Sequence, residues 1–466
     1  MRRRPSQVYW FVLAALVACT GLPLLGCDTS TTDRLLGEPV CSELTRGNAP
    51  DRPNVVIVVN DSMRRNELGL YGGDATTPHL DAFGREHLLF ENAFTQAPWT
   101  KPAIATLFTS LYPSQHRVAS DPQIWTLSGQ RAGDSVTRAD IVPDDFVTMA
   151  EVFRDAGYRT GAFVSNPWML ERFGFAQGFD VYDDSFASRE CSGETVIEAA
   201  RAWLTRLPSD QPYLLYVHLL DSRRPGRAGF ETTPALIREA YREGIEAFDH
   251  AFGQLTDGLR SHPRWSETAV IVTSDHGEAL YERGYGNHGS GLHDDEAAIP
   301  LIARLPGVES DDKQVGCLTG LVDLLPSFCR YLSIDCPAEV AGWSFVADRD
   351  QPPSDARRFL TTEGTMKHPS HRSIRNRHYK LVFEPGGPRD GRRKTTPWSL
   401  FDVASDPDER VDHAEPSGRT RKTDQVLAAL SHQLEASVPA MMAVETQALD
   451  IDTELRERLR AIRYGE

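Results

Sequence analysis

Several features that would identify common classes of protein are missing from this chain of 466 residues. Its 7 cysteines form no CxxC pair and no Cys/His spacing typical of a metal site. Basic residues are not in excess: 66 acidic side chains outnumber 50 basic ones, and the net charge of −16 argues against nucleic acid as a partner. No internal repeat or low-complexity segment stands out. What remains is a globular protein that is long enough for one large domain core and a second, smaller domain.

The longest apolar run lies at the start of the chain. Three arginines at positions 2–4 precede an apolar stretch over residues 8–25, which leads into the sequence LLGC. This order predicts a lipoprotein signal peptide over residues 1–26, with Cys27 carrying the lipid. An uncleaved transmembrane anchor is the alternative, although a glycine and a proline interrupt the end of the run. Both interpretations place the folded part outside the cytoplasm, membrane-anchored in the cell envelope on the periplasmic or extracellular side.

The pattern of the remaining chain predicts its fold class. Residues 27–52 are polar and lack sustained periodicity, which predicts a flexible tether. From residue 53 onward, unbroken apolar runs typical of buried strands alternate with helical patterns. We therefore predict an α/β sandwich with a large mixed, mostly parallel sheet between helices over 53–345, followed by a small α+β subdomain over 346–466. The apolar runs are 54–59, 160–164, 213–220 and 269–274, and a helical pattern covers 147–157.

The cysteines beyond residue 27 are odd in number. In an oxidising compartment this allows one or two disulfides and leaves at least one thiol, and the pairing stays open. Cys329 lies in an apolar helical pattern and is predicted to be a buried helix residue. The five are Cys41, Cys191, Cys317, Cys329 and Cys336.

Polar residues follow several of the predicted strands. Asp61, Asp221 and the pair Asp275 and His276 come at strand ends, where functional groups of open α/β sheets gather. A single aspartate there is ordinarily a helix cap or a turn residue. The sequence Asp-His-Gly-Glu after residue 274, however, supplies two adjacent ligand types. Together with Asp61, it predicts a divalent-metal site.

Thr100 precedes a helical stretch with Pro102 in its first turn. A threonine at such a position is most often a plain N-cap. The same hydroxyl would also lie in the positive field of the helix end, where an anionic ester can be held. A metal beside it would lower the pKa of the hydroxyl and make it a nucleophile.

With these residues in view, the chain from residue 53 nearly to its end resembles the bacterial sulfatases of the alkaline phosphatase superfamily. The likeness is specific because the motifs recur in order and at family spacing. The segments that carry it include NVVIVVNDSMRRNELGLYGG, TQAPWT, LFTSLYPSQH, FRDAGYRTGAFVSN, IVTSDHGEALYERGYGNHGSG, IPLIARLPG and SLFDVASDPDER.

The resemblance implies one divalent cation beside the nucleophile. It places Asp61, Asp275 and His276 on metal ligands and Thr100 on the nucleophile, which can itself bind the metal. His288 falls where the family has a basic residue near the leaving group. The family's usual ion is calcium, and a site containing histidine also suits Mn, Mg or Zn.

Departures from the family pattern are equally informative. The family's Cys-x-Pro-Ser-Arg is replaced by residues 100–104, TKPAI, so the formylglycine precursor and its arginine are both absent. Ser62 stands where many members have a second metal-binding aspartate. Arg223 and Arg283 occupy places of family histidines, either to clamp an anionic ester or as solvated charges.

Two further histidines, His218 and His293, are predicted to be structural, through hydrogen bonds to loops. Three functions remain open. The first is a metal-dependent hydrolase of sulfate or phosphate esters, with Thr100 as nucleophile and His288 and Arg223 assisting. The second is a transferase of the cell envelope, of the phosphoethanolamine or glycerol-phosphate type, whose one-metal site the set resembles. The third is a catalytically silent binder of anionic glycans or headgroups. The expected partner in each case is an anionic ester or headgroup on a glycan, lipid or small molecule.

Overall fold

A computed structural model describes most of the chain after residue 43. The chain divides into two units, Met1–Glu38 and Pro39–Glu466, and the following concerns the second. The apolar run at the start lies outside the described residues, as does Cys27. The described residues are 36, 44–118, 137–188, 191–223, 233–348, 359–366, 368, 370–385, 396–437 and 448–452.

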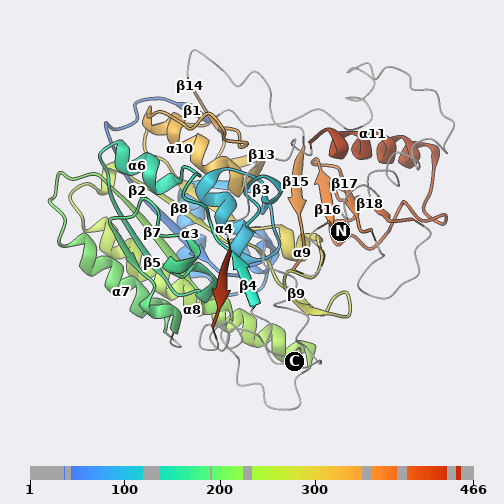
Figure 1. Cartoon of the computed structure of the whole chain (residues 1–466), viewed down its shortest axis with the longest axis horizontal. Coiled ribbons are helices and arrows are strands. Elements are labelled where there is room, and N and C mark those ends of the chain that lie inside the picture. Colours follow the sequence, from blue (N-terminus) through green and yellow to red (C-terminus); the bar gives the residue numbers. More distant parts are fainter. Residues whose placement is uncertain are drawn as a thin grey trace, which may run out of the picture. The chain divides into compact units, whose positions relative to one another are not determined.

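An eight-stranded mixed sheet is the centre of the described part, as predicted (Figure 1). Seven of its strands run in one direction, and β11 runs against its neighbours β3 and β8. In spatial order the strands are β13 (Gln314–Gly320), β3 (Leu88–Phe94), β11 (Leu301–Arg304), β8 (Thr268–Thr273), β2 (Asn54–Asn60), β7 (Tyr213–Leu219), β5 (Arg159–Val164) and β6 (Val181–Asp183).

Helices cover both faces of this sheet, and β2 shows why. Its side chains alternate between two apolar cores: Val55, Ile57 and Val59 pack in one, and Val56 and Val58 in the other. A strand buried on both faces needs apolar residues at every position, which explains its unbroken β-branched sequence. Residues of α4 (Thr100–Thr109), α6 (Met149–Asp155) and α10 (Leu324–Leu332) fill the first core, and residues of α3 (Pro78–Glu86), α7 (Gly193–Leu204) and α8 (Pro234–Arg260) fill the second.

A second, antiparallel sheet follows the large one in sequence. It is four-stranded, in the order β15 (Leu360–Glu363), β16 (Arg372–Arg375), β17 (Tyr379–Phe383) and β18 (Trp398–Asp402), and α11 (Arg421–Ser437) contacts β16 and β17. This matches the predicted α+β region. The structure also contains two short helices and a small two-stranded sheet. These are α5 (Pro113–His116), α9 (Asp294–Ala297) and the pair β9 (Ala279–Leu280) and β10 (Gly286–Asn287).

Two small sheets join segments that lie far apart in the sequence. β1 (Leu44–Arg46) pairs with both β12 (Val308–Glu309) and β14 (Val346–Asp348). Residues 44–46 lay within the predicted tether, but Leu44 is buried in the first core, so this part of the segment is folded structure. β4 (Thr137–Asp140) pairs with β19 (Ala448–Ile451), and Figure 1 shows the two side by side.

The cysteines in the described ranges include one disulfide-bonded residue and three free thiols. Cys317 is disulfide-bonded, whereas Cys191, Cys329 and Cys336 are free thiols. Cys329 is a buried residue of α10, as predicted. Within the described ranges, no helix combines the length and the apolar character needed to cross a membrane.

Candidate metal and nucleophile site

Four neighbouring strands deliver the polar residues of the site to one edge of the large sheet. Asp275 and His276 follow β8, Asp61 follows β2, and Asn166 follows β5, while His218 lies within β7. Because these strands are parallel, their carboxyl ends meet at the same edge. All five side chains are buried.

Asp61, Asp275 and His276 form a cluster that fits a metal ion. One ligand atom from each lies within 4.8 Å of the others. Oδ1 of each carboxylate is held by Ser62: Oδ1 of Asp61 accepts from the hydroxyl of Ser62 at 2.7 Å, and Oδ1 of Asp275 accepts from its amide at 3.1 Å. Oδ2 of Asp275 has no hydrogen-bond partner among the described residues. A buried carboxylate oxygen without a partner is the atom that a cation would satisfy.

The hydrogen bonds of His276 define which of its nitrogens can bind a cation. Nδ1 lies 2.8 Å from the carbonyl oxygen of Gly277. A carbonyl only accepts hydrogen bonds, so Nδ1 carries the proton and donates, and Nε2 carries the lone pair. Nε2 lies 3.4 Å from Oδ2 of Asp275. The carbonyl of the next residue, Gly277, thus orients the imidazole as a ligand.

The cluster holds more negative charge than burial tolerates. Burial, with a further contribution from the neighbouring Asp61 carboxylate, raises the pKa of Asp275 to about 7, although His218 opposes this. Two carboxylates this close repel one another in a low-dielectric site. A divalent cation removes that repulsion, and the donor set of two carboxylates and an imidazole is suited to one.

Thr100 lies directly beside this cluster. Its Oγ1 donates to Oδ2 of Asp61 at 3.0 Å and lies 3.3 Å from Nε2 of His276. Contrary to the N-cap interpretation, Thr100 is the first residue inside α4, and Trp99 is the cap. The hydroxyl is therefore not used to cap the helix and is directed at the predicted metal ligands.

Asn166 bonds to both Thr100 and Asp61. Its Nδ2 donates to Oγ1 of Thr100 at 3.2 Å and makes a short hydrogen bond to Oδ2 of Asp61. Its Oδ1 accepts from the amide of Trp168 at 2.8 Å, which determines which end of the side chain faces the site. Asn166 is therefore a fixed donor next to the hydroxyl of Thr100.

The ring of His288 lies against that of His276, with the two ring centroids 4.4 Å apart. Its Nδ1 lies 2.9 Å from a carboxylate oxygen of Glu278. Because a carboxylate accepts, Nδ1 donates, and Glu278 thereby fixes the orientation of the ring. This is the arrangement expected of a residue that transfers a proton.

The residues that replace the family's arginine motif are buried in the structure. Ile104 belongs to the first apolar core and has no exposed surface. Lys101 is also fully buried, and its Nζ lies 4.2 Å from the ring centroid of Phe173. Burial lowers the pKa of Lys101 to about 7, although Asp140 opposes this. The amine is therefore held against an aromatic ring, and no described residue accepts a hydrogen bond from it.

Arg283 takes neither of its two predicted roles, because it is part of an internal ion network. Its guanidinium lies 3.1 Å from Asp295 and 3.1 Å from Glu409. Glu409 is fully buried and also pairs with Lys380 at 2.8 Å and with His293 at 2.9 Å. Burial opposes ionisation of Glu409, but these cations, Lys380 first, hold its pKa well below the usual range. His293 is thus structural, as predicted.

Two other predicted residues lie outside this cluster or outside the described side chains. Oδ1 of Asp221 accepts from the amide of Gly193 at the start of α7, at 3.2 Å, so Asp221 has the structural role of an ordinary strand-end aspartate. The backbone of Arg223 is in a short 3-10 helix, and its side chain lies outside the described part.

Sequence reasoning missed two members of this group. Asn166 follows β5 by two residues, and the strand-end rule that selected Asp61 and Asp275 would have found it. His218 is predicted to be structural through hydrogen bonds to loops, whereas its ring lies 3.0 Å from the hydroxyl of Tyr216 and 3.6 and 4.0 Å from the carboxylates of Asp61 and Asp275. A lone polar residue near the end of an otherwise apolar strand was the available signal.

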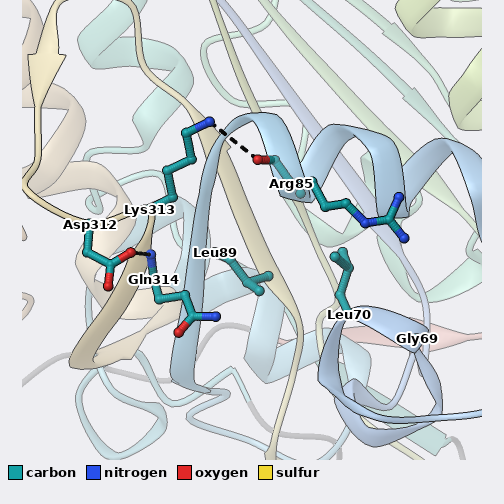
Figure 2. A pocket seen from close by; sticks show the side chains of 8 residues that line it. Gly69, Leu70, Arg85, Leu89, Asp312, Lys313 and Gln314 are labelled. Atoms are coloured by element: carbon teal, nitrogen blue, oxygen red, sulfur yellow. Dashed lines mark hydrogen bonds between the residues drawn. The ribbon is translucent and has the colours of Figure 1, made fainter.

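A surface pocket lies at the opposite edge of the sheet (Figure 2). It includes the starts of β3 and β13, where Leu89 pairs with Gln314, so it is remote from the strand ends that carry Asp61 and Asp275. Nζ of Lys313 donates to the carbonyl of Arg85 at 3.3 Å. The lining residues are Gly69, Leu70, Gly84, Arg85, Leu89, Asp312, Lys313 and Gln314.

Comparisons with known proteins agree with this geometry. A family model described as sulfatase matches residues 53–334. An ulvan-active sulfatase of Formosa agariphila is 24% identical over 421 residues, covering 77% of this chain and 76% of the relative. A structure solved in complex with its substrate D-glucosamine-2-N,6-O-disulfate is similar in fold, with a TM-score of 0.65 and 16% identity over 84% of this chain and 99% of the other. A phosphonate monoester hydrolase of Agrobacterium radiobacter gives a TM-score of 0.64 and 18% identity over 86% of this chain and its whole length.

Proposed function

Because the chain belongs to the sulfatase family of ester hydrolases, we propose that it is a metal-dependent hydrolase that uses Thr100 in place of formylglycine and prefers phosphate esters to sulfate esters. One observation carries the proposal. The hydroxyl of Thr100 is directed at the carboxylate of Asp61 and at Nε2 of His276, at 3.0 and 3.3 Å, rather than at the backbone of its own helix.

Each residue has a role in the proposed reaction. The Thr100 oxygen attacks phosphorus as its proton passes to Oδ2 of Asp61, to which it already donates, and Asn166, which donates to that oxygen, keeps it in line. The P–O bond to the alcohol breaks, and His288, oriented by Glu278, gives the leaving oxygen a proton. Water then attacks the phosphothreonine and gives a proton back to His288. The P–O bond to Thr100 breaks, the Thr100 oxygen recovers its proton from Asp61, and phosphate is released. A divalent cation bound by Asp61, Asp275 and His276 would supply charge that lowers the pKa of a neighbouring hydroxyl.

The choice of phosphate over sulfate follows from how the nucleophile is regenerated. A formylglycine hydrate releases sulfate by collapsing to an aldehyde, so the sulfur is never attacked again. Threonine has no such route, and a sulfated Thr100 would be an ordinary alkyl sulfate. A phosphorylated Thr100 can be attacked a second time at phosphorus, with bound positive charge neutralising the developing charge.

The substrate panel that tests this proposal compares matched aryl phosphate, aryl phosphodiester and aryl sulfate esters with Ca²⁺, Mn²⁺, Mg²⁺ and Zn²⁺. We expect turnover of a phosphate ester to exceed that of the sulfate with at least one cation. Multiple turnover of the sulfate at the higher rate would contradict the preference. A protein that binds a cation but turns over no ester would favour the silent binder.

An acceptor alcohol can replace water in the second step, which would make the protein a transferase of envelope phosphate groups. The relatives named above include proteins that act on sulfated glycans, so a phosphorylated or sulfated glycan is the natural first class to screen. Including an acceptor alcohol in the same panel separates transfer from hydrolysis, because the transferred product appears only with the alcohol.

We also propose that the protein is anchored in the cell envelope through a lipid on Cys27, on the basis of the arginines, apolar run and LLGC sequence at its start. Cys27→Ala should release the protein from the membrane fraction or block processing of residues 1–26. Fractionation with size analysis of both forms is the measurement. Unchanged size and unchanged membrane association would contradict the anchor.

A further inference from the structure

His218 occupies a position that its neighbours do not explain. It is the sixth residue of β7 and lies between Val59 of β2 and Val164 of β5. Alternate residues of a strand share a face, so His218 points to the same side as Tyr216, which packs in the core that also contains α4. The ring is completely buried. An imidazole in the interior of an apolar strand needs a partner.

One of its ring nitrogens lacks that partner. Nδ1 lies 3.0 Å from the hydroxyl of Tyr216, but Nε2 has no hydrogen-bond partner among the described residues. Nε2 lies 3.6 Å from Oδ2 of Asp61 and 4.0 Å from Oδ2 of Asp275, both too long for a hydrogen bond. Oδ2 of Asp275 is also unpartnered. Two buried orphan atoms therefore face each other across the predicted metal position.

We propose that Nε2 of His218 is a further ligand of the catalytic cation, and that this second imidazole makes the site select Zn²⁺ or Mn²⁺ over Ca²⁺. The inference rests on the proposed function only in placing a cation between Asp61 and Asp275. Ligand atoms that share one tetrahedral zinc at about 2.0–2.1 Å lie about 3.3 Å apart. The separations of 3.6 and 4.0 Å need only a small inward movement to reach that value.

The selectivity follows from the donor atoms. Calcium takes six to eight oxygen ligands, whereas imidazole suits transition metals. The described cluster offers only two carboxylates, and the neighbouring Ser62 uses its hydroxyl in a hydrogen bond to Asp61. Few oxygen ligands together with a second imidazole shift the site away from calcium.

Tyr216 supports the lone pair that this role requires. Its hydroxyl oxygen lies 3.0 Å from Nδ1 of His218 and can accept a hydrogen bond from it. If Nδ1 of His218 donates to that oxygen, the lone pair lies on Nε2, toward the carboxylates. His276 is oriented in the same way, because its Nδ1 donates to the carbonyl of Gly277.

A rival role predicts the opposite result. If His218 were a protonated counter-ion for Asp61 and Asp275, it would repel a bound cation, and removing it would tighten cation binding. If it is a ligand, removing it must weaken binding of Zn²⁺ and Mn²⁺. The sign of one affinity change therefore separates the two roles.

The test is direct titration of metal-free protein with Zn²⁺, Mn²⁺ and Ca²⁺, without substrate. We expect His218→Gln to lower Zn²⁺ affinity by more than about 100-fold, because even outer-shell partners contribute about 10- to 100-fold, and to change Ca²⁺ affinity far less. The matched control is His262→Gln, since His262 packs on Tyr213 at the opposite end of β7. Unchanged or tighter Zn²⁺ binding by His218→Gln would overturn the inference.

A second measurement needs no variant and so does not depend on the folding of His218→Gln. X-ray absorption at the zinc edge of the wild-type protein counts coordinated imidazole rings. Two rings are expected, from His276 and His218, and a single ring would overturn the inference. Because neither experiment involves an ester, a failed substrate panel leaves both interpretable: the cation site would stand while the proposed reaction would not.

Discussion

Replacing Thr100 by alanine is expected to abolish turnover of every ester that the wild-type protein cleaves, with a loss of about 10⁴- to 10⁶-fold, as for removal of other covalent nucleophiles. The reason is geometric. Thr100 Oγ1 contacts Asp61, His276 and Asn166 simultaneously, at 3.0, 3.3 and 3.2 Å. Alanine removes the attacking atom and leaves those three partners in place. Steady-state rates on the best substrate of the panel are the measurement.

Two controls make this result specific to the nucleophile. Thr100→Ser keeps an oxygen at the same place and should retain substantial activity, whereas a purely structural role for the threonine methyl group would make serine as harmful as alanine. Thr109→Ala removes a threonine from the other end of α4, where its hydroxyl donates to the carbonyl of Ala105. Activity that persists in Thr100→Ala would show that another group attacks the ester.

Asp275→Asn is expected to remove both the bound cation and the activity. The substituted amide side chain would keep the shape of the aspartate but lose its charge, and the site of the unpartnered Oδ2 would no longer attract a cation. Because Asp61 and Asp275 are the only carboxylates in the described cluster, half of its anionic charge is lost. Cation affinity should fall by more than about 100-fold, which exceeds the effect of outer-shell changes. Metal content after dialysis, measured together with rate, tests this.

The matched control for this variant is Asp221→Asn. Asp221 is also a buried strand-end aspartate, but its carboxylate accepts from the amide of Gly193 rather than facing the cluster. The Asp221→Asn protein should lose some stability and retain its cation. Full metal occupancy in Asp275→Asn would show that the cation lies elsewhere. Loss of metal in both variants would indicate a fold defect, which thermal unfolding of each protein would detect.

Much of the fold could be predicted because each strand buried on both faces has an unmistakable sequence. The runs ending near residues 60 and 274 became β2 and β8, and the rule that function follows strand ends led from them to Asp61, Asp275 and His276. These inferences are local, since strand, turn and polar residue lie within a few positions of one another. The structure brings the three side chains together with Thr100 at the same sheet edge.

What could not be predicted depends on contacts between distant segments. Arg283 has the same sequence context whether it binds an anion or pairs with Glu409, which lies 126 positions further along the chain. The role of His218 likewise depends on which face of β7 meets α4. Thr100 looked like a helix cap because one turn of sequence cannot tell the cap from the first helical residue. In each case the missing information was tertiary.

The ion network around Glu409 bears on when the enzyme becomes complete during its synthesis. Arg283 and His293, which bind Glu409, bracket the segment that carries His288, so this segment is held by a residue near the end of the chain. A nascent chain with residues 53–348 already contains Thr100 and the Asp61, Asp275 and His276 cluster, but it lacks Glu409, which holds the segment that carries His288. The protein is therefore unlike a catalytic domain with a detachable accessory. If the proposed roles hold, a chain that ends before Glu409 should bind the cation and yet turn over esters poorly.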